Sequence, residues 1–494
     1  MVKGFKQQFS IDYVDTFAPT IRSSTLCLLL SFTAQNGTAI HQCNVKNTYL
    51  NSQLKDNITL YSELTPKYED FHKLPPNLKG KPNVATQWFV SVYGSKQDAH
   101  DWYAEVKKFF TELSYSISTA DKAVFYIIED NKFTIIAAAT DDFSVITDLA
   151  NSANLLIQKQ LTKRFEISDL GPINWLLDVN ITQDLFAHTI SLSQQAYIKQ
   201  IINHFNLTEA RIVTTPMEAS IDLSFDSHHI SAIILTPAEK TKYHEMIGCL
   251  MYTAVMTHPD ISFAVSSLSQ YLDTPCTTHL QAVIRVFCYL SGTKNLKLTL
   301  GGLNTMITGY SDSDWASQTH RHLISRFAFF IGMGIVSWSS KKQLIITLSS
   351  TEAEYVALTH SSNDIIWIHK LLAKFSTIFP TTLPTTLYCD NQGTIHLSKD
   401  STFHGCTKHI DVHFHFIHQT VSQGHIALLY CPIDNMIVDT FTKPLAQEIP
   451  PDSQCPLKVH NPRGGVSLFT PWTIFTWYHK SPPSITTSYL HLLS

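Results

Sequence analysis

The spacing of apolar residues in the first half of the chain alternates between helical and strand patterns. In three segments apolar residues recur every three or four positions, as on the buried face of an amphipathic helix. These segments are 25–34, 99–113 and 194–205. Two β-rich runs, 125–128 and 133–139, are separated by four polar residues and predict a hairpin. The first half is therefore expected to combine helices with a sheet.

The pattern changes after the first half. Residues 218–240 are polar and loop-like, which predicts a linker, whereas 241–295 carry a helical pattern throughout. Pro259 and Pro275 mark helix starts or breaks, because proline lacks a backbone N–H. The apolar run 327–338 is too short to span a bilayer and is better explained by paired strands.

The C-terminal third begins with strands and continues with alternating helices and strands. The expected elements are strands 306–311, 325–332 and 334–339, helix 351–375, strand 385–389, two helical stretches, strand 426–431 and a helix from Asn435. This order is βββαβαβα. The last 45 residues, 450–494, hold 7 of the 21 prolines and have no usable periodicity, so no packed domain is expected there.

Composition narrows the class of protein. The 494 residues include 36 Lys plus Arg against 40 Asp plus Glu, and 44% are hydrophobic. This balance argues against disorder and against a protein that coats nucleic acid through bulk positive charge. The nine cysteines are scattered without a CxxC pair, as in the reduced core of an intracellular protein. The first 30 residues lack a signal-peptide layout, and no membrane association is expected.

Four carboxylates fall at informative places in the βββαβαβα pattern. Asp312 follows the first strand, Glu354 lies one turn into the long helix, Asp390 ends the next strand and Asp439 opens the final helix. Acidic oxygen donors without Cys or His ligands suit Mg²⁺. Two such ions could activate a water and stabilise the leaving oxygen of a phosphodiester. The alternative, that each acid is a helix cap or a solvated residue, explains one acid better than four in this order.

Several short sequence motifs surround these acids. They are GYSDSDW (309–315), SWSSKKQ (337–343), LSSTEAEY (348–355), YCDNQ (388–392) and TKHIDV (407–412). Together they resemble the ribonuclease H domain of copia-type retrotransposon polyproteins. The resemblance implies that Asp312, Glu354, Asp390 and Asp439 bind two Mg²⁺ ions, or Mn²⁺, and cut RNA in an RNA–DNA hybrid. Arg326 stands where the family usually has glycine, and is expected either to disturb the sheet edge or to point outward.

The first half contains further short motifs, which occur in the same order as in this family. They are TAQNG (33–37), HQ (41–42), VKN (45–47), YG (93–94), KQ (96–97), WY (102–103), DD (141–142), FEISDLG (165–171) and TPM (215–217). They resemble the reverse transcriptase that precedes the ribonuclease H domain. The resemblance implies that Asp141 and Asp142 are paired metal-binding carboxylates, with an RNA template and DNA as partners. Asn44 stands where the family has a third Asp, so two Mg²⁺ ions would be under-neutralised and polymerisation is expected to be impaired.

The expected fold class is α+β with α/β parts. It comprises a polymerase palm-like domain, a helical connection and a ribonuclease H-like domain. The chain begins within a sequence motif of the family, so the fingers of the polymerase are expected to be truncated. The expected boundaries are 1–217, 218–300 and 301–448, followed by an irregular tail over 449–494.

Two alternatives remain beside a retrotransposon Pol-derived enzyme. One is a decayed relic that at most binds nucleic acid, and the other is a generic Mg²⁺ nuclease, which leaves the first half unexplained. Separately, the histidine-rich stretch could form a zinc site from His404, Cys406, His409, His413, His415 and His418. It lacks the second paired half that structural zinc sites usually show. A local phosphate-contacting surface is expected from Lys341, Lys342, Lys408 and Lys443.

Overall fold

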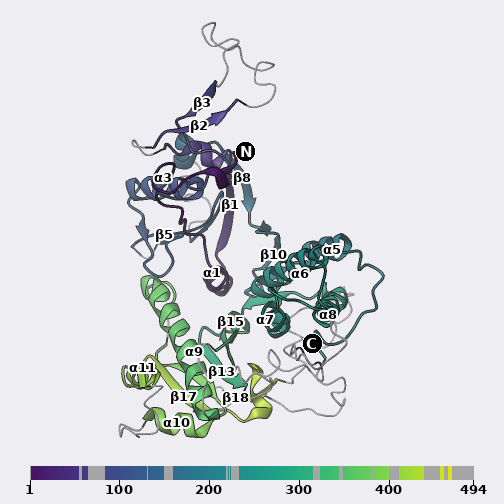
Figure 1. The fold of residues 1–494 in the computed structure, drawn as a ribbon. Helices are drawn as coiled ribbons and strands as arrows, with labels where there is room; N and C mark the ends of the chain where they lie inside the picture. The colour runs from purple at the N-terminus through teal and green to yellow at the C-terminus, as the bar shows by residue number, and fades with distance from the viewer. Residues whose placement is uncertain are drawn as a thin grey trace, which may run out of the picture. The chain divides into compact units, whose positions relative to one another are not determined.

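A computed structural model divides the chain into two compact units (Figure 1). Unit 1 comprises Met1–Arg22 and Thr38–Ile173, and unit 2 comprises Ser23–Gly37 and Asn174–Ser494. The structure describes residues 2–54, 58–64, 84–130, 132–148, 159–218, 221, 223, 233–314, 323–343, 349–380, 382–399, 411–438, 457–460 and 466–469.

Unit 1 is built on an antiparallel sheet with the strand order β4-β5-β6-β7-β1-β8. Its elements are η1 (Gly4–Lys6), β1 (Ala39–Val45), η2 (Thr48–Asn51), β2 (Leu60–Glu63), β3 (Ala85–Trp88), α3 (Asp98–Glu112), β4 (Ser116–Ile117), β5 (Val124–Glu129), β6 (Lys132–Ala139), β7 (Asp142–Thr147) and β8 (Ile167–Pro172). Helix α3 packs Trp102, Val106 and Phe110 against Phe125 and Phe143 of the sheet. The three helix residues recur at four-residue spacing, which places them on one face. The predicted helix and hairpin are confirmed.

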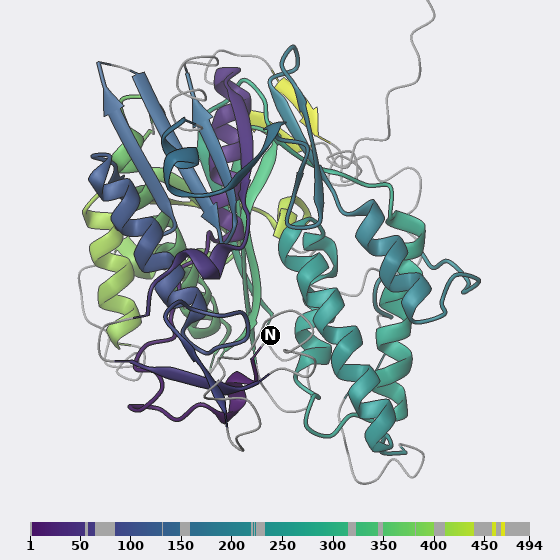
Figure 2. The ribbon, with the colours of Figure 1, turned by 90° about the horizontal axis from the view of Figure 1, so that it is seen from above.

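The first part of unit 2 combines a small sheet with a group of helices. The sheet has the order β12-β11-β10-β9. Its strands and the neighbouring helices are α1 (Ser23–Asn36), β9 (Trp175–Leu176), β10 (Val179–Asp184), β11 (Thr189–Ser193), α5 (Gln195–His204), α6 (Pro237–Met256), η3 (Pro259–Ile261), α7 (Ser262–Ser269), α8 (Thr277–Thr293) and β12 (Leu298–Gly301). Figure 2 shows α5, α6 and α8 side by side, and their buried residues share one apolar core with those of α7.

The boundary of the predicted linker is wrong at its C-terminal end. Residues 237–240 are not loop but the first turn of α6. The Thr236 side chain accepts a hydrogen bond from the backbone of Glu239, whose carboxylate accepts one from the Thr236 backbone. This capping box, with Pro237 at the first helical position, satisfies N–H groups that have no partner inside the helix. Thr-Pro-Ala-Glu was the signal for an earlier helix start.

The second part of unit 2 is a mixed sheet with the order β15-β14-β13-β16-β17. Its elements are β13 (Ile307–Asp314), β14 (Ile324–Ile331), β15 (Gly334–Lys342), α9 (Ser350–Leu372), η4 (Ala373–Phe375), β16 (Thr385–Cys389), α10 (Gln392–Lys399), α11 (Asp411–Ser422), β17 (Ile426–Tyr430) and η6 (Ile433–Asn435). The first three strands are antiparallel, whereas β16 and β17 run parallel to β13. The described strands and helices occur in the expected order as far as β17, with two helices between β16 and β17; most of the expected final helix lies outside the described residues.

Two smaller expectations can be compared with the described residues. Every cysteine that the structure describes is a free thiol, and most are buried. The tail expected to be irregular contains regular structure, because β18 (Leu457–His460) pairs with β19 (Val466–Phe469). No helix within the described part of the chain is long and apolar enough to cross a membrane.

Gly309 provides a test of the packing that holds β13 in the centre of its sheet. A Cβ atom at this position would lie 2.3 Å from Cε1 of Phe329 and 2.9 Å from Cδ1 of Leu387, both fully buried residues of the flanking strands. Gly309→Ala is therefore expected to lower the free energy of unfolding by about 1–3 kcal/mol, measured by urea denaturation.

Gly248→Ala in α6 is the matched control, because nothing lies within 4 Å of its added Cβ. Alanine is favoured over glycine inside a helix, so this variant should be more stable by about 0.5–1 kcal/mol. Equal effects of the two substitutions would contradict the account of Gly309.

Candidate active sites

The sheet of β13 and β16 brings together acids that are far apart in the sequence. Asp312 lies near the end of β13, and Asp390 comes directly after β16. Because these neighbouring strands are parallel, their C-terminal ends meet at the same edge of the sheet. Glu354 lies in the first turns of α9, whose start is capped by the Ser349 hydroxyl accepting from the backbone of Glu352.

Glu354 and Asp390 lie close enough to share a metal ion, and the charge of Asp312 acts on Glu354. One donor atom from each of Glu354, Cys389 and Asp390 falls within 4.8 Å of the others. Glu354 Oε1 accepts hydrogen bonds from the Ser313 backbone N–H at 3.1 Å and from the Ser313 hydroxyl at 2.8 Å. Asp312 and Glu354 are both buried. We call Asp312, Glu354 and Asp390 the acidic cluster.

The environment of the acidic cluster opposes its negative charge. Burial, and then the charges of Asp312 and Asp390, raise the pKa of Glu354 well above its usual value. Burial, and then the charge of Glu354, likewise raise the pKa of the Cys389 thiol. Cys389 therefore stays protonated near neutral pH and is a poor metal ligand there. The carboxylates remain as the candidate ligands.

The raised pKa of Glu354 has a measurable effect on stability. The folded state holds this proton more tightly than the unfolded state, in which the pKa is 4.5. The stabilising contribution of Glu354 is therefore complete below pH 4.5 and is lost as the pH rises through the raised pKa.

Metal-free Glu354→Gln, which resembles the protonated side chain, isolates this contribution from those of the other acids. Denaturation at several pH values should show the variant gaining stability over the native protein as the pH rises above 4.5. A stability difference that is independent of pH would contradict the raised pKa.

Arg326 is the residue whose position differs most from the expectation. Strand β14 continues through it, with Asp312 of β13 and Ser340 of β15 as its cross-strand partners. Its side chain is 1% exposed, and Nη1 donates to Oδ2 of Asp312 at 3.2 Å. The guanidinium carbon lies 5.4 Å from the centroid of the Phe263 ring. Both expectations were wrong, since Arg326 neither disturbs an edge nor points outward.

A second pair of acids lies in unit 1 at the turn between β6 and β7. Ala139 pairs with Asp142, so Thr140 and Asp141 form a two-residue turn, with a positive φ of 57° at Thr140. The indole N–H of Trp102 donates to the Thr140 carbonyl oxygen at 2.7 Å. Helix α3 thereby holds the turn in place.

Asn44 on β1 faces both acids. Its amide nitrogen donates to Oδ2 of Asp141 and to Oδ1 of Asp142, each at 3.1 Å. Gln42 adds a longer contact to Asp142 at 3.4 Å. Burial raises the pKa of Asp142, and the hydrogen bond from Asn44 opposes that shift. The side of Asn44 turned toward the acids is therefore its N–H₂ group, a donor that competes with a metal for the carboxylate oxygens.

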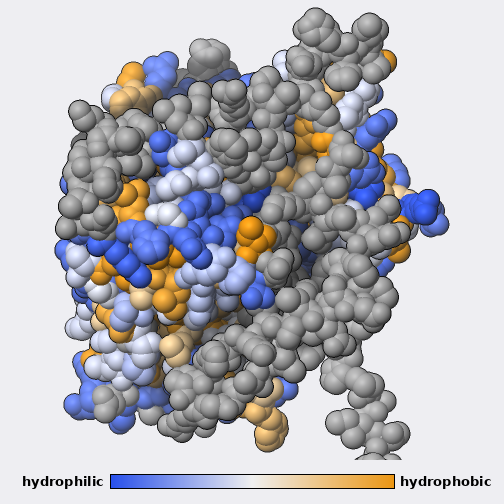
Figure 3. Space-filling view, turned by 90° about the horizontal axis from the view of Figure 1, so that it is seen from below, coloured by the Kyte–Doolittle hydropathy of each residue, from blue (hydrophilic) through white to orange (hydrophobic). Residues whose placement is uncertain are grey.

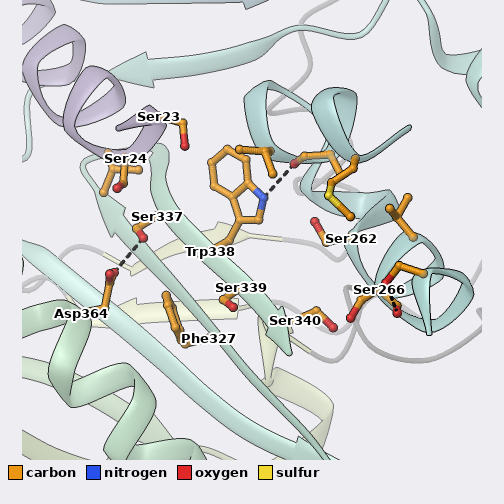
Figure 4. A pocket seen from close by; sticks show the side chains of 16 residues that line it. Ser23, Ser24, Ser262, Ser266, Phe327, Ser337, Trp338, Ser339, Ser340 and Asp364 are labelled. Atoms are coloured by element: carbon orange, nitrogen blue, oxygen red, sulfur yellow. Dashed lines mark hydrogen bonds between the residues drawn. The ribbon is translucent and has the colours of Figure 1, made fainter. Parts of the chain in front are cut away.

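A pocket of about 380 Å³ lies in unit 2 beside β15 (Figure 4). It is walled by Trp338, whose indole N–H donates to the Ala254 carbonyl oxygen at 3.0 Å, and by Ser337, whose hydroxyl donates to Asp364 at 2.7 Å. Part of the SWSSKKQ motif therefore lines this pocket. None of the three acids of the acidic cluster lines it.

Several predicted site residues cannot be compared with the structure. Asp439, His404, Cys406, His409, Lys408 and Lys443 lie outside the described residues. Lys341 is exposed and Lys342 is half-buried. Figure 3 shows hydrophilic and hydrophobic residues interspersed over one face of the molecule.

Sequence reasoning missed three residues that contact the candidate sites. Ser313 donates to Glu354, Gln42 contacts Asp142, and Cys389 lies against Glu354 with its sulfur 4.0 Å from Oε2. Ser313 and Cys389 each adjoin a predicted acid in sequence, which was the available signal. Gln42 precedes Asn44 by two positions, and strand alternation places both side chains on one face.

Known proteins resemble both parts of the chain. Residues 1–219 match the family model described as reverse transcriptase (RNA-dependent DNA polymerase). About 90% of the chain is similar to plant transposon polyproteins. The chain is therefore similar over most of its length to retrotransposon Pol polyproteins of the copia type, and its residues 1–219 match the reverse transcriptase family.

Two of these relatives are retrovirus-related Pol polyproteins. The one from transposon TNT 1-94 of Nicotiana tabacum is 31% identical over 446 residues, covering 90% of this chain and 32% of the relative. The one from transposon RE1 of Arabidopsis thaliana is 32% identical over 451 residues, covering 90% and 29%. The chain thus spans about a third of their length. A solved ribonuclease H1 from compost, LC11, covers 26% of this chain at 14% identity with a TM-score of 0.20, so the assignment rests on the sequence matches.

Proposed function

We propose that unit 2 contains a ribonuclease H domain that cleaves RNA in RNA–DNA hybrids. The observation that carries the proposal is the convergence of Asp312, Glu354 and Asp390 at one sheet edge, where burial, and then the charges of Asp312 and Asp390, raise the pKa of Glu354. The order of antiparallel and then parallel strands, β15-β14-β13-β16-β17, supports a ribonuclease H-like fold. The palm-like fold of unit 1 and the boundaries 1–217, 218–300, 301–448 and 449–494 remain proposals of the same kind.

The donor set of the acidic cluster fits a divalent cation that prefers oxygen. The carboxylates of Glu354 and Asp390 lie close enough to share a metal ion. Burial and the nearby negative charges destabilise the ionised form of Glu354, and a bound cation would offset the repulsion between these charges. Asp439 is proposed as the fourth ligand from the sequence resemblance. Bound Mg²⁺ or Mn²⁺ would supply activation of a water molecule and stabilisation of the leaving oxygen. Ser313 would hold the Glu354 carboxylate in one orientation through its two hydrogen bonds.

The substrate class is tested by offering the full chain four labelled nucleic acids with Mn²⁺. The proposal expects the RNA strand of an RNA–DNA hybrid to be cut, and duplex DNA, duplex RNA and single-stranded RNA to remain intact. Cleavage of all four would favour a generic nuclease. Intact hybrid after incubation with folded protein would contradict the proposal.

We further propose that the reverse transcriptase domain is impaired in polymerisation. Asn44 supplies an N–H₂ group where Asp141 and Asp142 would otherwise share a metal with a third carboxylate. Primer extension on an RNA template should therefore stay at background with either Mg²⁺ or Mn²⁺. Extension that disappears on Asp141→Ala would contradict this.

A decayed relic that only binds nucleic acid is the second candidate function. It is favoured by two observations, the amide of Asn44 between the polymerase-like acids and the ion pair of Asp312 with Arg326. It predicts hybrid binding without cleavage. A gel-shift measurement beside the cleavage assay separates the two candidates.

A further inference from the structure

Arg326 places a permanent positive charge at the acidic cluster. Its side chain is 1% exposed, so solvent screens the charge of the guanidinium little. Its Nη1 lies 3.2 Å from Oδ2 of Asp312. A carboxylate oxygen that accepts this hydrogen bond has one lone pair fewer to offer a metal.

The surroundings of Arg326 oppose its displacement. Strand β14 is paired on both sides at this residue, with Asp312 and Ser340 opposite. The guanidinium also lies over the ring of Phe263 in α7, at 5.4 Å from the centroid. Moving the side chain away would separate a buried ion pair and leave a buried charge without its partner, which is strongly unfavourable.

We propose that Arg326 is a built-in cation that holds Asp312 and weakens the affinity of the acidic cluster for divalent metal. The inference rests on the proposed function in so far as that function needs metal at this cluster. Two effects act together. Asp312 is engaged by the guanidinium, and the positive charge repels any cation that Glu354 and Asp390 bind. The acidic cluster therefore needs a higher metal concentration to fill than the three carboxylates would need without Arg326.

The test is a Mn²⁺ titration of the metal-free full chain, followed by the electron paramagnetic resonance signal of free Mn²⁺. Binding that is lost in Glu354→Gln defines the acidic cluster. Arg326→Gln should raise the affinity of that site about tenfold or more, because a unit charge a few ångströms from a divalent ion easily accounts for such a factor. Arg326→Lys keeps the charge and should bind Mn²⁺ as weakly as the native protein.

The double variant Arg326→Gln with Asp312→Asn replaces the ion pair by two neutral side chains of similar size, so it does not leave a buried charge unpaired. Its Mn²⁺ affinity should stay within about twofold of the native value, because the engaged Asp312 adds no net charge to the site. This variant decides the question if Arg326→Gln alone does not fold.

An affinity gain in Arg326→Gln below about threefold would overturn the inference, and so would a loss of about tenfold or more in the neutral pair. The latter would mean that Asp312 already binds metal and that Arg326 moves aside. Hybrid cleavage is measured separately on the same proteins. If the affinities follow the expectation but no variant cleaves, the proposed function fails while the role of Arg326 stands.

Discussion

Replacing Glu354 by glutamine is expected to abolish metal-dependent cleavage of an RNA–DNA hybrid, with a loss on the order of a thousandfold or more. Burial, and then the charges of Asp312 and Asp390, raise the pKa of Glu354. Glutamine keeps the shape and one oxygen but removes the charge that attracts a divalent cation. The measurement is the initial rate of hybrid cleavage at saturating Mn²⁺.

The same substitution should stabilise the metal-free protein at neutral pH. It removes a buried carboxylate that lies near two like charges, and the side-chain oxygen can still accept from Ser313. Loss of activity together with gain of stability separates a role in metal binding from a structural role. A variant that cleaves at the native rate, or that loses activity only because it unfolds, would contradict the assignment.

Replacing Asn44 by aspartate is expected to destabilise unit 1 in the presence of a chelator by about 2–4 kcal/mol. The change removes two hydrogen bonds of 3.1 Å and places a third carboxylate beside Asp141 and Asp142. Added Mn²⁺ should recover much of this stability, because three carboxylates form a better cation site than two. Thermal unfolding with and without Mn²⁺ measures both effects.

Asn44→Ala is the matched control for this experiment. It removes the same donors without adding charge, so it should cost less stability and should gain little from Mn²⁺. If Asn44→Asp were as stable as the native protein in chelator, the contact of Asn44 with the two acids would be in doubt.

The sequence predicted most elements because their signals are local. Helix α3 has apolar residues at four-residue spacing, and the β5–β6 hairpin follows from two β-rich runs separated by four polar residues. The start of α6 lies within a polar stretch that lacks apolar periodicity, and its signal is the capping box of Thr236 and Glu239. The small sheet of β9 to β12 joins strands across more than a hundred residues, which no local pattern reveals.

The candidate sites were predictable in their residues but not in their contacts. The positions of Asp312, Glu354 and Asp390 at strand ends and at a helix start indicated that they could meet. The role of Arg326 depends on the register of β14 against β13, which puts it opposite Asp312. A shift of one residue would turn its side chain to the other face of the sheet. The orientation of the Asn44 amide likewise depends on its neighbours in space.

The most direct test of the central claim compares the full native chain with Asp390→Asn on a hybrid whose RNA strand is labelled. Asp390 lies half-buried at the end of β16, where a neutral amide of the same size should leave the fold intact, as circular dichroism can check. The account predicts that the native chain cuts the RNA strand when Mn²⁺ is saturating and that Asp390→Asn does not. Equal cleavage by both proteins, or none by the folded native chain, would contradict it.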